Sequence, residues 1–156
     1  MGFSFGQNSS NQLATVDPAL QAVCRRAIQI SPIDFSVLEG RRSITRQHEL
    51  YAQGRDAAAL HKAGVFDVPA NPGKPIVTWT LNSRHFPDPK TGLGNAVDLC
   101  PSPVDFNDMA KYRQIRDAMY EAANLLGTPV RWGGDWDGDG VTEKGETDFG
   151  HFELKR

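Results

Sequence analysis

Residues 132–154 read WGGDWDGDGVTEKGETDFGHFEL, and the rest of the chain is best understood from this stretch outward. Asp148 and His151 stand three residues apart near its end. His151 begins a short apolar alternation that ends at Leu154 and predicts a strand. Ahead of Asp148, acidic residues and glycines follow one another in a spacing typical of a calcium loop. Two candidate sites therefore overlap in the last part of the chain.

The first candidate site is a zinc site that includes residues far upstream. Imidazole and carboxylate groups are common zinc ligands, and His85 and His151 each stand next to a predicted strand with an acid nearby. Asp98 lies in the alternating run 96–99, where an unpaired carboxylate would be costly to bury. We expect His85, Asp98 and His151 to hold one Zn²⁺ ion, with Asp148 beside it as the proton-transfer group. The alternative is that the histidines are ordinary polar residues and Asp98 a salt-bridge partner.

The second candidate site fits the twelve-residue loop of an EF-hand. Gly140 permits the sharp turn that this loop needs. The expected Ca²⁺ ligands are the side chains of Asp135, Asp137, Asp139 and Glu146 and the carbonyl of Val141. A calcium ion here would order the loop that leads to Asp148 and His151, and would so regulate the zinc site. Amphipathic helices do not flank the loop in the sequence, and a solvated acidic loop is the alternative.

Composition limits the class of protein. The 156 residues predict one domain, 1–156. With 17 basic and 19 acidic side chains, the net charge of −2 gives no electrostatic reason to expect nucleic acid or a membrane as partner. Cys24 and Cys100 are too few for a disulfide framework, and we expect buried thiols. The N-terminus does not read as a signal peptide, and no apolar run reaches the ~20 residues of a membrane span.

The pattern of apolar residues predicts an α+β fold, with a small, mostly antiparallel sheet and about three helices. Helices are expected at 18–30, 45–53 and from 105 or 107 to 126, with a helical turn or two at 57–63. Strands are expected at 35–39, 76–80, 95–100, 130–132 and 151–154. Residues 1–15 are expected to form a loosely ordered arm. The three tryptophans, Trp79, Trp132 and Trp136, are expected in the core or in the walls of a cleft.

Several motifs resemble those of a known enzyme family. The runs 83–85 (SRH) and 94–99 (GNAVDL) resemble the S-x-H and G-x-A-x-D motifs of zinc D-alanyl-D-alanine carboxypeptidases and L-alanyl-D-glutamate endopeptidases. The run 148–153 (DFGHFE) resembles the D-x-x-H-F-E end of that family. Further similar runs are 39–42 (EGRR) with Gln47, 51–55 (YAQGR) and 132–136 (WGGDW). The likeness spans Leu13 to Leu154 and is greatest to single-domain L-alanyl-D-glutamate endopeptidases of bacteriophages. His85 and Asp98 lie further apart than is usual, because residues 86–93 carry an insert.

This resemblance implies a Hedgehog/D,D-peptidase-like fold and assigns roles to particular residues. It makes His85, Asp98 and His151 the zinc ligands and Asp148 the catalytic base. Arg42, Gln47 and Ser83 match positions that bind the substrate or support the zinc ligands. The implied function is that of a phage endolysin, which hydrolyses the L-alanyl-D-glutamate bond of peptidoglycan stem peptides by zinc-activated water.

The resemblance leaves two other functions open. One is a D-alanyl-D-alanine carboxypeptidase, and the other is a non-catalytic module that holds zinc and recognises the cell wall. The expected partner in each case is the peptidoglycan stem peptide, and we expect a monomer without a separate wall-binding domain. The expected location is the host cytoplasm until release, and then the periplasm and its peptidoglycan.

Overall fold

The computed structural model describes residues 2–155, and its centre is a four-stranded antiparallel sheet. The strands lie in the order β1-β2-β4-β3. Their bounds are Phe35–Glu39 for β1, Ala96–Pro101 for β2, Val130–Gly133 for β3 and Asp148–Leu154 for β4. The sheet and the helices around it confirm the α+β prediction.

Five helices are present within residues 2–155, where about three were expected. They are α1 (Gln7–Leu13), α2 (Pro18–Ile30), α3 (Ile44–Ala52), α4 (Ala57–Lys62) and α5 (Met109–Leu126). Helix α2 starts as its sequence predicts, because the Asp17 side chain accepts the N–H of Ala19 and proline occupies the first turn. Helix α5 ends at Gly127, whose φ of +66° is a conformation that glycine adopts without strain.

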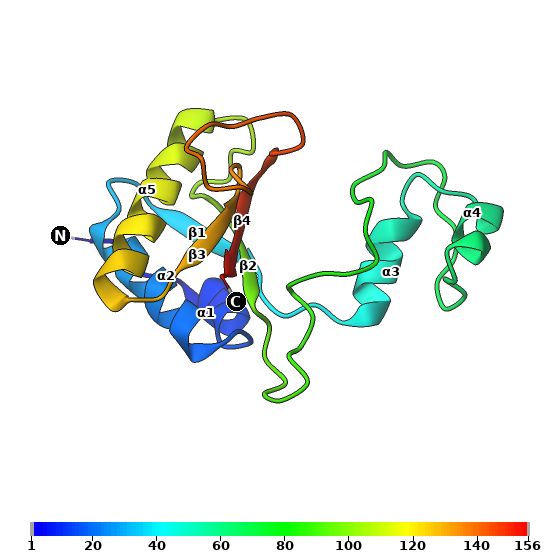
Figure 1. The fold of residues 1–156 in the computed structure, drawn as a ribbon, viewed down its shortest axis with the longest axis horizontal. Helices are drawn as coiled ribbons and strands as arrows, with labels where there is room; N and C mark the ends of the chain where they lie inside the picture. The colour runs from blue at the N-terminus through cyan, green and yellow to red at the C-terminus, as the bar shows by residue number, and fades with distance from the viewer. Residues whose placement is uncertain (1, 156) are drawn as a thin grey trace.

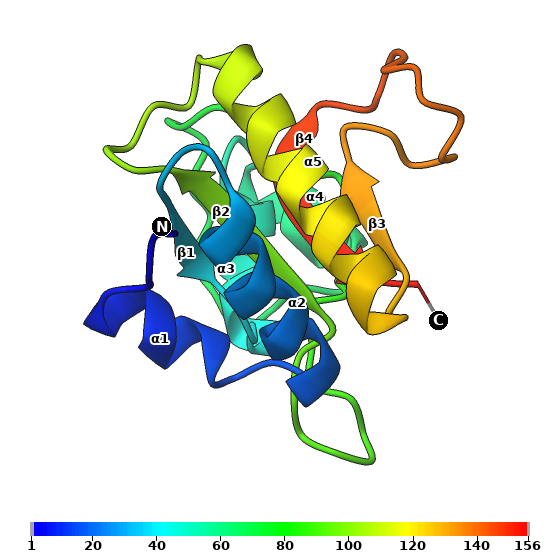
Figure 2. The same cartoon turned by 90° about the vertical axis from the view of Figure 1, so that its left-hand side faces the viewer.

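The hydrophobic core lies between one face of the sheet and helices α2 and α5 (Figure 2). Side chains of a strand alternate between the two faces, so Val97 and Leu99 of β2 point into this core. Phe152 and Leu154 of β4 do the same. The residues between them, including Asp98, therefore face the opposite side of the sheet. The sheet thus separates a dry core from a polar face that is free to carry chemistry.

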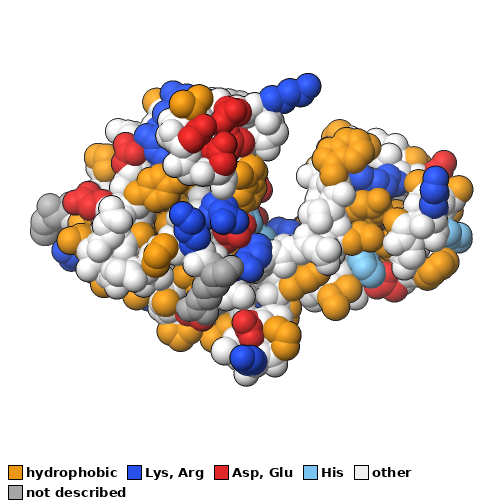
Figure 3. All heavy atoms as spheres, in the orientation of Figure 1, with side chains coloured by type: hydrophobic (Ala, Val, Ile, Leu, Met, Phe, Trp, Pro, Cys, Tyr) orange, Lys and Arg blue, Asp and Glu red, His pale blue; other side chains and the backbone are white. Residues whose placement is uncertain are grey.

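Residues 43–83 form a lobe beside the polar face, with helices α3 and α4 (Figure 1). The lobe has a small apolar cluster of its own around Ala52, Leu60 and Val65. The chain enters the lobe after Arg42 and leaves it before Arg84, and the N–H of Arg42 donates to the carbonyl of His85 at 2.7 Å. Figure 3 shows a hollow between this lobe and the sheet.

Two local predictions were wrong, for different reasons. A loose arm was expected over residues 1–15, of which residue 1 lies outside the described residues. Residues 7–13 instead form α1, which packs on β1, with Leu13 buried and the Ser9 hydroxyl accepting the N–H of Val37. Residues 76–80 form no strand. They lie on the lobe, away from the edges of the sheet, and Val77 is exposed. High β propensity reflects the fit of a side chain to a half-buried sheet, so it has no effect where no sheet is in reach.

The remaining boundaries differ by a few residues from those expected. Helix α5 begins at Met109, because the side chain of Asp108 accepts the N–H of Lys111 and caps the helix there. Strand β4 begins at Asp148, three residues before the expected start. Within residues 2–155, none of the helices combines the length and the apolar character that crossing a membrane requires.

Candidate metal centre

The pairing of β2 with β4 places Asp98 directly opposite His151. Both side chains lie on the polar face of the sheet, and His151 Nδ1 is 3.5 Å from Asp98 Oδ1. His85 approaches from the segment that follows the lobe, and its Nε2 lies 3.3 Å from the same oxygen. The three ligand atoms are all within 4.8 Å of one another. The structure therefore brings together the three residues that the sequence analysis selected.

The orientation of each imidazole is fixed by a contact on its far side. His85 Nδ1 lies 2.7 Å from the carbonyl oxygen of Gly40, which can only accept, so Nδ1 carries the proton and Nε2 presents a lone pair. His151 Nε2 lies 2.9 Å from Glu153 Oε1, which leaves Nδ1 facing Asp98. Fixing a ligating histidine through its other nitrogen is the usual second layer of a metal site.

The atoms that point at one another lack partners of their own. Among residues 2–155, His85 Nε2 and Asp98 Oδ1 are buried and have no hydrogen-bond partner. Leaving buried polar atoms unsatisfied is costly, and a cation between them removes that cost. Two imidazoles and one carboxylate are a donor set that suits zinc and leaves a position open for water. The buried group of His85, Asp98 and His151 can thus bind a metal ion such as zinc.

The charges of these residues shift one another's pKa values. Burial raises the pKa of Asp98, but the imidazoles of His151 and His85 outweigh this and hold it well below its ordinary value. Burial lowers the pKa of His151, but the carboxylates of Asp98, Glu153 and Asp148 outweigh this and raise it to about 9. The carboxylates around His151 thus favour a positive charge at this place.

Asp148 stands at the open side of this group. Its side chain is 60 % exposed, and Oδ2 is 3.8 Å from His151 Nδ1. Partial desolvation and the negative charge of Asp98 raise the pKa of Asp148, against the opposing effect of the nearby cations. The backbone of Asp148 can pass this close to β3 only because residue 133 is glycine. A Cβ on Gly133 would lie 2.2 Å from the Asp148 carbonyl oxygen, which is a steric clash. Asp148 is thus a solvent-accessible carboxylate beside the candidate metal site.

Arg42 is held from three sides next to Asp98. Its Nε and Nη2 each donate to one oxygen of Glu39 at 2.8 Å, and Nη2 is 3.4 Å from Asp98 Oδ2. Its Nη1 donates to Gln47 Oε1 at 2.8 Å. Gln47 in turn donates from Nε2 to the carbonyl of Thr80 at 2.8 Å and is only 1 % exposed. Gln47 thus braces both Arg42 and the part of the lobe that faces the sheet.

A cavity of about 220 Å³ joins the polar face of the sheet to the lobe. Ser83 lies in its wall, and its hydroxyl accepts the N–H of His85 at 3.1 Å. Trp136 closes another side, with its ring centroid 5.2 Å from that of His151. All of the residues expected at the zinc site and the substrate cleft line this cavity: Arg42, Gln47, Ser83, His85, Asp98, Asp148 and His151.

Three contributors were not identified from the sequence: Glu39, Gly40 and Glu153. Glu153 carried a usable signal, since it lies two residues after His151 in a predicted strand and so shares its face. Its Oε2 is also 3.3 Å from Arg84 Nε and 3.9 Å from Arg131 Nη1. The Gly40 carbonyl carried no such signal, because every residue has a backbone carbonyl and the residue type does not show which of them accepts a hydrogen bond.

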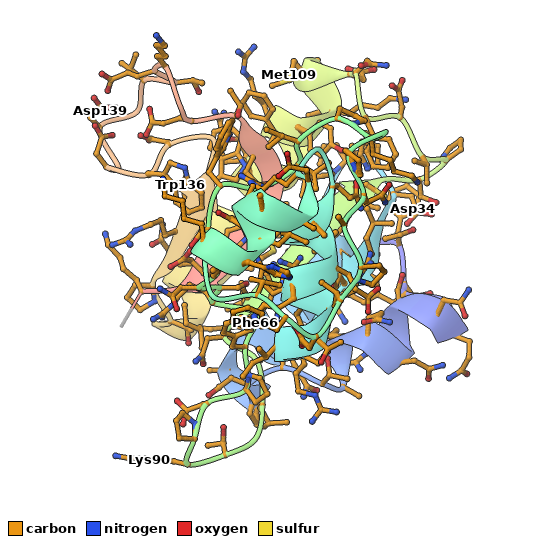
Figure 4. The ribbon with its side chains drawn as sticks, turned by 90° about the vertical axis from the view of Figure 1, so that its right-hand side faces the viewer. Asp34, Phe66, Lys90, Met109, Trp136 and Asp139 are labelled. Carbon is orange, nitrogen blue, oxygen red and sulfur yellow. The ribbon has the colours of Figure 1, made fainter. Side chains whose placement is uncertain are left out.

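The expected calcium loop forms two overlapping groups of carboxylates. Ligand atoms of Asp135, Asp137 and Glu146 lie within 4.8 Å of one another, and so do those of Asp137, Asp139 and Glu143. Hydrogen bonding with Asp139 and the charges of Asp139 and Asp137 raise the pKa of Glu143 to about 7. The loop connects β3 to β4 and projects beyond the sheet (Figure 4). Helices do not flank it within the described residues, which departs from an EF-hand.

The carboxylates of this loop already accept backbone hydrogen bonds. Asp135 accepts the N–H groups of Gly140 at 2.8 Å and Asp139 at 3.2 Å. Glu146 accepts the N–H of Glu143 at 2.8 Å. The side chain of Val141, whose carbonyl was expected as a ligand, is 58 % exposed. The acidic loop is therefore ordered by its own contacts, and calcium regulation has no support in this geometry.

Comparison with known proteins identifies the family of this chain. The family model of the phage L-alanyl-D-glutamate peptidases matches residues 1–63 and 71–155. The L-alanyl-D-glutamate peptidase of Escherichia phage T5 is 32% identical over 161 residues, which cover 99% of each chain. The crystal structure of the L-Ala D-Glu endopeptidase ChiX of Serratia marcescens is similar, with a TM-score of 0.67 and 30% identity. That match covers 99% of this chain and 91% of ChiX. Because the matches extend over nearly the whole chain, it belongs to the phage L-alanyl-D-glutamate peptidase family.

Proposed function

We propose that this peptidase hydrolyses the L-alanyl-D-glutamate bond of peptidoglycan stem peptides with a zinc ion held by His85, Asp98 and His151. The observation that carries this proposal is the convergence of two oriented imidazoles on Asp98 Oδ1, where this oxygen and His85 Nε2 are buried without a hydrogen-bond partner. Zinc bound there supplies a Lewis acid, which polarises the scissile carbonyl and makes a bound water more acidic.

Asp148 is the proton-transfer group in this proposal. Its carboxylate lies beside His151 and is open to solvent, so it can take a proton from the attacking water and pass it to the leaving amine. A raised pKa suits both steps, because the group must release the proton as readily as it accepts it.

Arg42 is proposed to stabilise the negative charge that develops on the scissile carbonyl oxygen. Its guanidinium has five N–H donors. Glu39 takes two of them, Gln47 takes one, and the second N–H of Nη2 faces Asp98. One N–H of Nη1 remains for the substrate. Gln47 and Ser83 are proposed to keep the cleft in shape, through Thr80 and through the backbone of His85.

The experiment is digestion of purified peptidoglycan, followed by mass spectrometry of the released fragments and metal analysis of the protein. The proposal expects fragments that begin at D-glutamate, one zinc per chain, loss of activity with a chelator and recovery with zinc. Release of D-alanine alone would identify a carboxypeptidase, and no release by zinc-loaded protein would indicate a module that only binds.

A calcium ion in the loop 135–146 is a second, separate part of the proposal. It is supported by the spacing of the acidic residues and by the two carboxylate groups that share Asp137. Calorimetry with calcium on the zinc-loaded protein tests it, with magnesium as the control. Absence of calcium-dependent heat rejects the calcium site.

The biological role we propose is that of an endolysin. The family is one of phage peptidases, and the bond it cleaves lies in the host cell wall. We propose that the protein acts as a monomer, remains in the host cytoplasm until release and then degrades peptidoglycan in the periplasm. Lysis of cells whose outer membrane has been permeabilised, compared between wild type and Asp148→Ala, tests this role.

A further inference from the structure

Trp79 is the most exposed large hydrophobic residue among residues 2–155, at 80 %. It was expected in the core or in a cleft wall, and Trp132 and Trp136 do occupy such places. Trp79 instead stands between Thr78 and Thr80, which both line the cavity of the candidate metal site. The open indole ring is thus carried by a segment that lines the cavity, although the Trp79 side chain is not part of the lining.

The segment that carries Trp79 is held firmly against the lobe. The guanidinium of Arg55 lies 5.2 Å from the centroid of the Trp79 ring and 3.8 Å from that of Tyr51. Gly54, with a φ of +81°, allows the backbone at Ile76 to approach closely, because a Cβ on Gly54 would lie 2.8 Å from the backbone nitrogen of Ile76. Gln47 ties down the carbonyl of Thr80. The indole is therefore ordered before any partner arrives, which lowers the entropy cost of binding.

The surroundings of Trp79 suit a sugar. A pyranose ring has one face of C–H groups that stacks on an aromatic ring, and a rim of hydroxyls that forms hydrogen bonds. Thr78, Thr80 and Asn82 add hydroxyl and amide groups to the wall of the adjoining cavity. Figure 3 shows apolar side chains on the edge of the lobe beside the hollow. An apolar surface placed next to a site in this way marks a place of interaction.

The chemistry of the substrate puts a sugar close to the reacting bond. In peptidoglycan, the L-alanine of the stem peptide is joined by an amide bond to the lactyl group of N-acetylmuramic acid. The bond that the family cleaves follows this L-alanine, so the saccharide is one amino acid away from the reacting carbonyl. When that carbonyl is at the metal centre, the sugar lies within the length of one amino acid of it, which a residue on the segment 78–82 that lines the cavity can reach.

We propose that Trp79, supported by Arg55, is a stacking platform for the peptidoglycan saccharide that bears the stem peptide. This inference rests on the proposed function and extends it, because it makes the enzyme recognise the glycan as well as the peptide. It predicts that part of the substrate affinity comes from a group that takes no part in the reaction.

Two substrates that differ only in the sugar test the proposal. One is the disaccharide–tetrapeptide of peptidoglycan, and the other is the same tetrapeptide with an N-lactyl cap. Replacing Trp79 by Ala is expected to raise KM for the disaccharide substrate about five- to tenfold, the loss of one aromatic stacking contact, and to leave KM for the capped peptide unchanged. Trp79→Tyr keeps a flat ring and is expected to restore most of the affinity.

Phe66 is the matched control. It is 74 % exposed on the same lobe but belongs to a segment, 57–70, that contributes no residue to the cavity lining, and Phe66→Ala is expected to leave both KM values as in wild type. An equal rise of KM on both substrates in Trp79→Ala would mean that the residue shapes the lobe or binds peptide, and the proposal falls. Unchanged KM on both substrates also overturns it.

A binding measurement separates this proposal from the proposed function. The metal-free protein is titrated with the N-acetylglucosaminyl–N-acetylmuramic acid disaccharide, and the indole N–H resonances are followed by NMR. The Trp79 signal is assigned by its loss in Trp79→Phe. A saturable shift of this signal, with the buried Trp132 unmoved, supports the platform even if wild type cleaves another bond. Absence of the shift rejects the platform even if wild type cleaves as proposed.

Discussion

Asp98 and His151 face each other across β2 and β4, with His151 Nδ1 3.5 Å from Asp98 Oδ1. Their opposition depends on the register of two strands, because a slip by one residue would turn one of the side chains into the hydrophobic core. The apolar neighbours Val97, Leu99 and Phe152 hold this register, since each is buried on the core face. The core that stabilises the fold therefore also aligns two of the three candidate ligands.

Removal of Asp148 is expected to separate catalysis from metal binding. Asp148→Ala should keep one zinc per chain and lower kcat by about 10²- to 10⁴-fold, because it removes the proton-transfer group and none of the ligands. His151→Ala should lose both the zinc and the activity. Metal analysis of the two purified variants, with rates on the capped tetrapeptide, checks this. Full turnover by Asp148→Ala would exclude it as the base.

Replacement of Glu153 by Gln is expected to weaken zinc binding about 10- to 100-fold, because the carboxylate that orients His151 loses its charge. Competition with a coloured chelator measures the affinity. Glu121→Gln, at an exposed position of α5, is the control for loss of one negative charge. An affinity equal to that of wild type would show that Glu153 supports the strand end and not the ligand.

The stability of the metal-free protein is expected to fall as the pH rises from about 6.5 to 9. His151 has a pKa of about 9 in the folded chain, against about 6.5 in an unfolded one. Below 6.5 both states are protonated, and the stabilisation from the charged imidazole is fully present. It is lost as the pH rises through 9, and the loss is on the order of 3 kcal/mol.

Urea denaturation of chelator-treated protein at several pH values measures this loss. Addition of zinc should reverse the trend, since zinc needs the neutral imidazole and should stabilise the protein more at pH 8.5 than at pH 6. A metal-free protein whose stability stays level between pH 6.5 and 9 would show that His151 titrates in the ordinary range.

Gln47→Leu is expected to reduce stability and activity together. The leucine leaves Arg42 Nη1 and the Thr80 carbonyl without their partner, which costs about 1–3 kcal/mol. Glu49→Leu on the exposed side of the same helix is the control. Urea denaturation and kcat/KM on the capped tetrapeptide give the two readouts. A variant with unchanged stability and a raised KM would instead identify Gln47 as a direct substrate contact.

The sequence predicted those residues of the site that lie in a recognisable local pattern. Asp98 stood out as a carboxylate between Val97 and Leu99 in a strand, and Asp148 and His151 as a pair at the start of another. Glu39 and the Gly40 carbonyl were not predictable, because their roles depend on contacts with Arg42 and His85 that only the folded chain creates.

The amino-acid pattern by itself determined helices α2 and α5 and the strands that build the sheet, and it made His85, Asp98 and His151 candidates, which the resemblance of the surrounding motifs to a known family then assigned as ligands. These follow from caps, from periodic apolar residues and from the choice of imidazole and carboxylate. Tertiary structure decided that 76–80 makes no strand, that residues 7–13 form a helix on β1, and that Trp79 is exposed on the lobe. The physical reason is that the periodicity of apolar residues shows which face of a segment can be buried. Whether that face is buried, and whether the backbone pairs with a strand, depends on neighbouring segments that only the whole fold brings into contact.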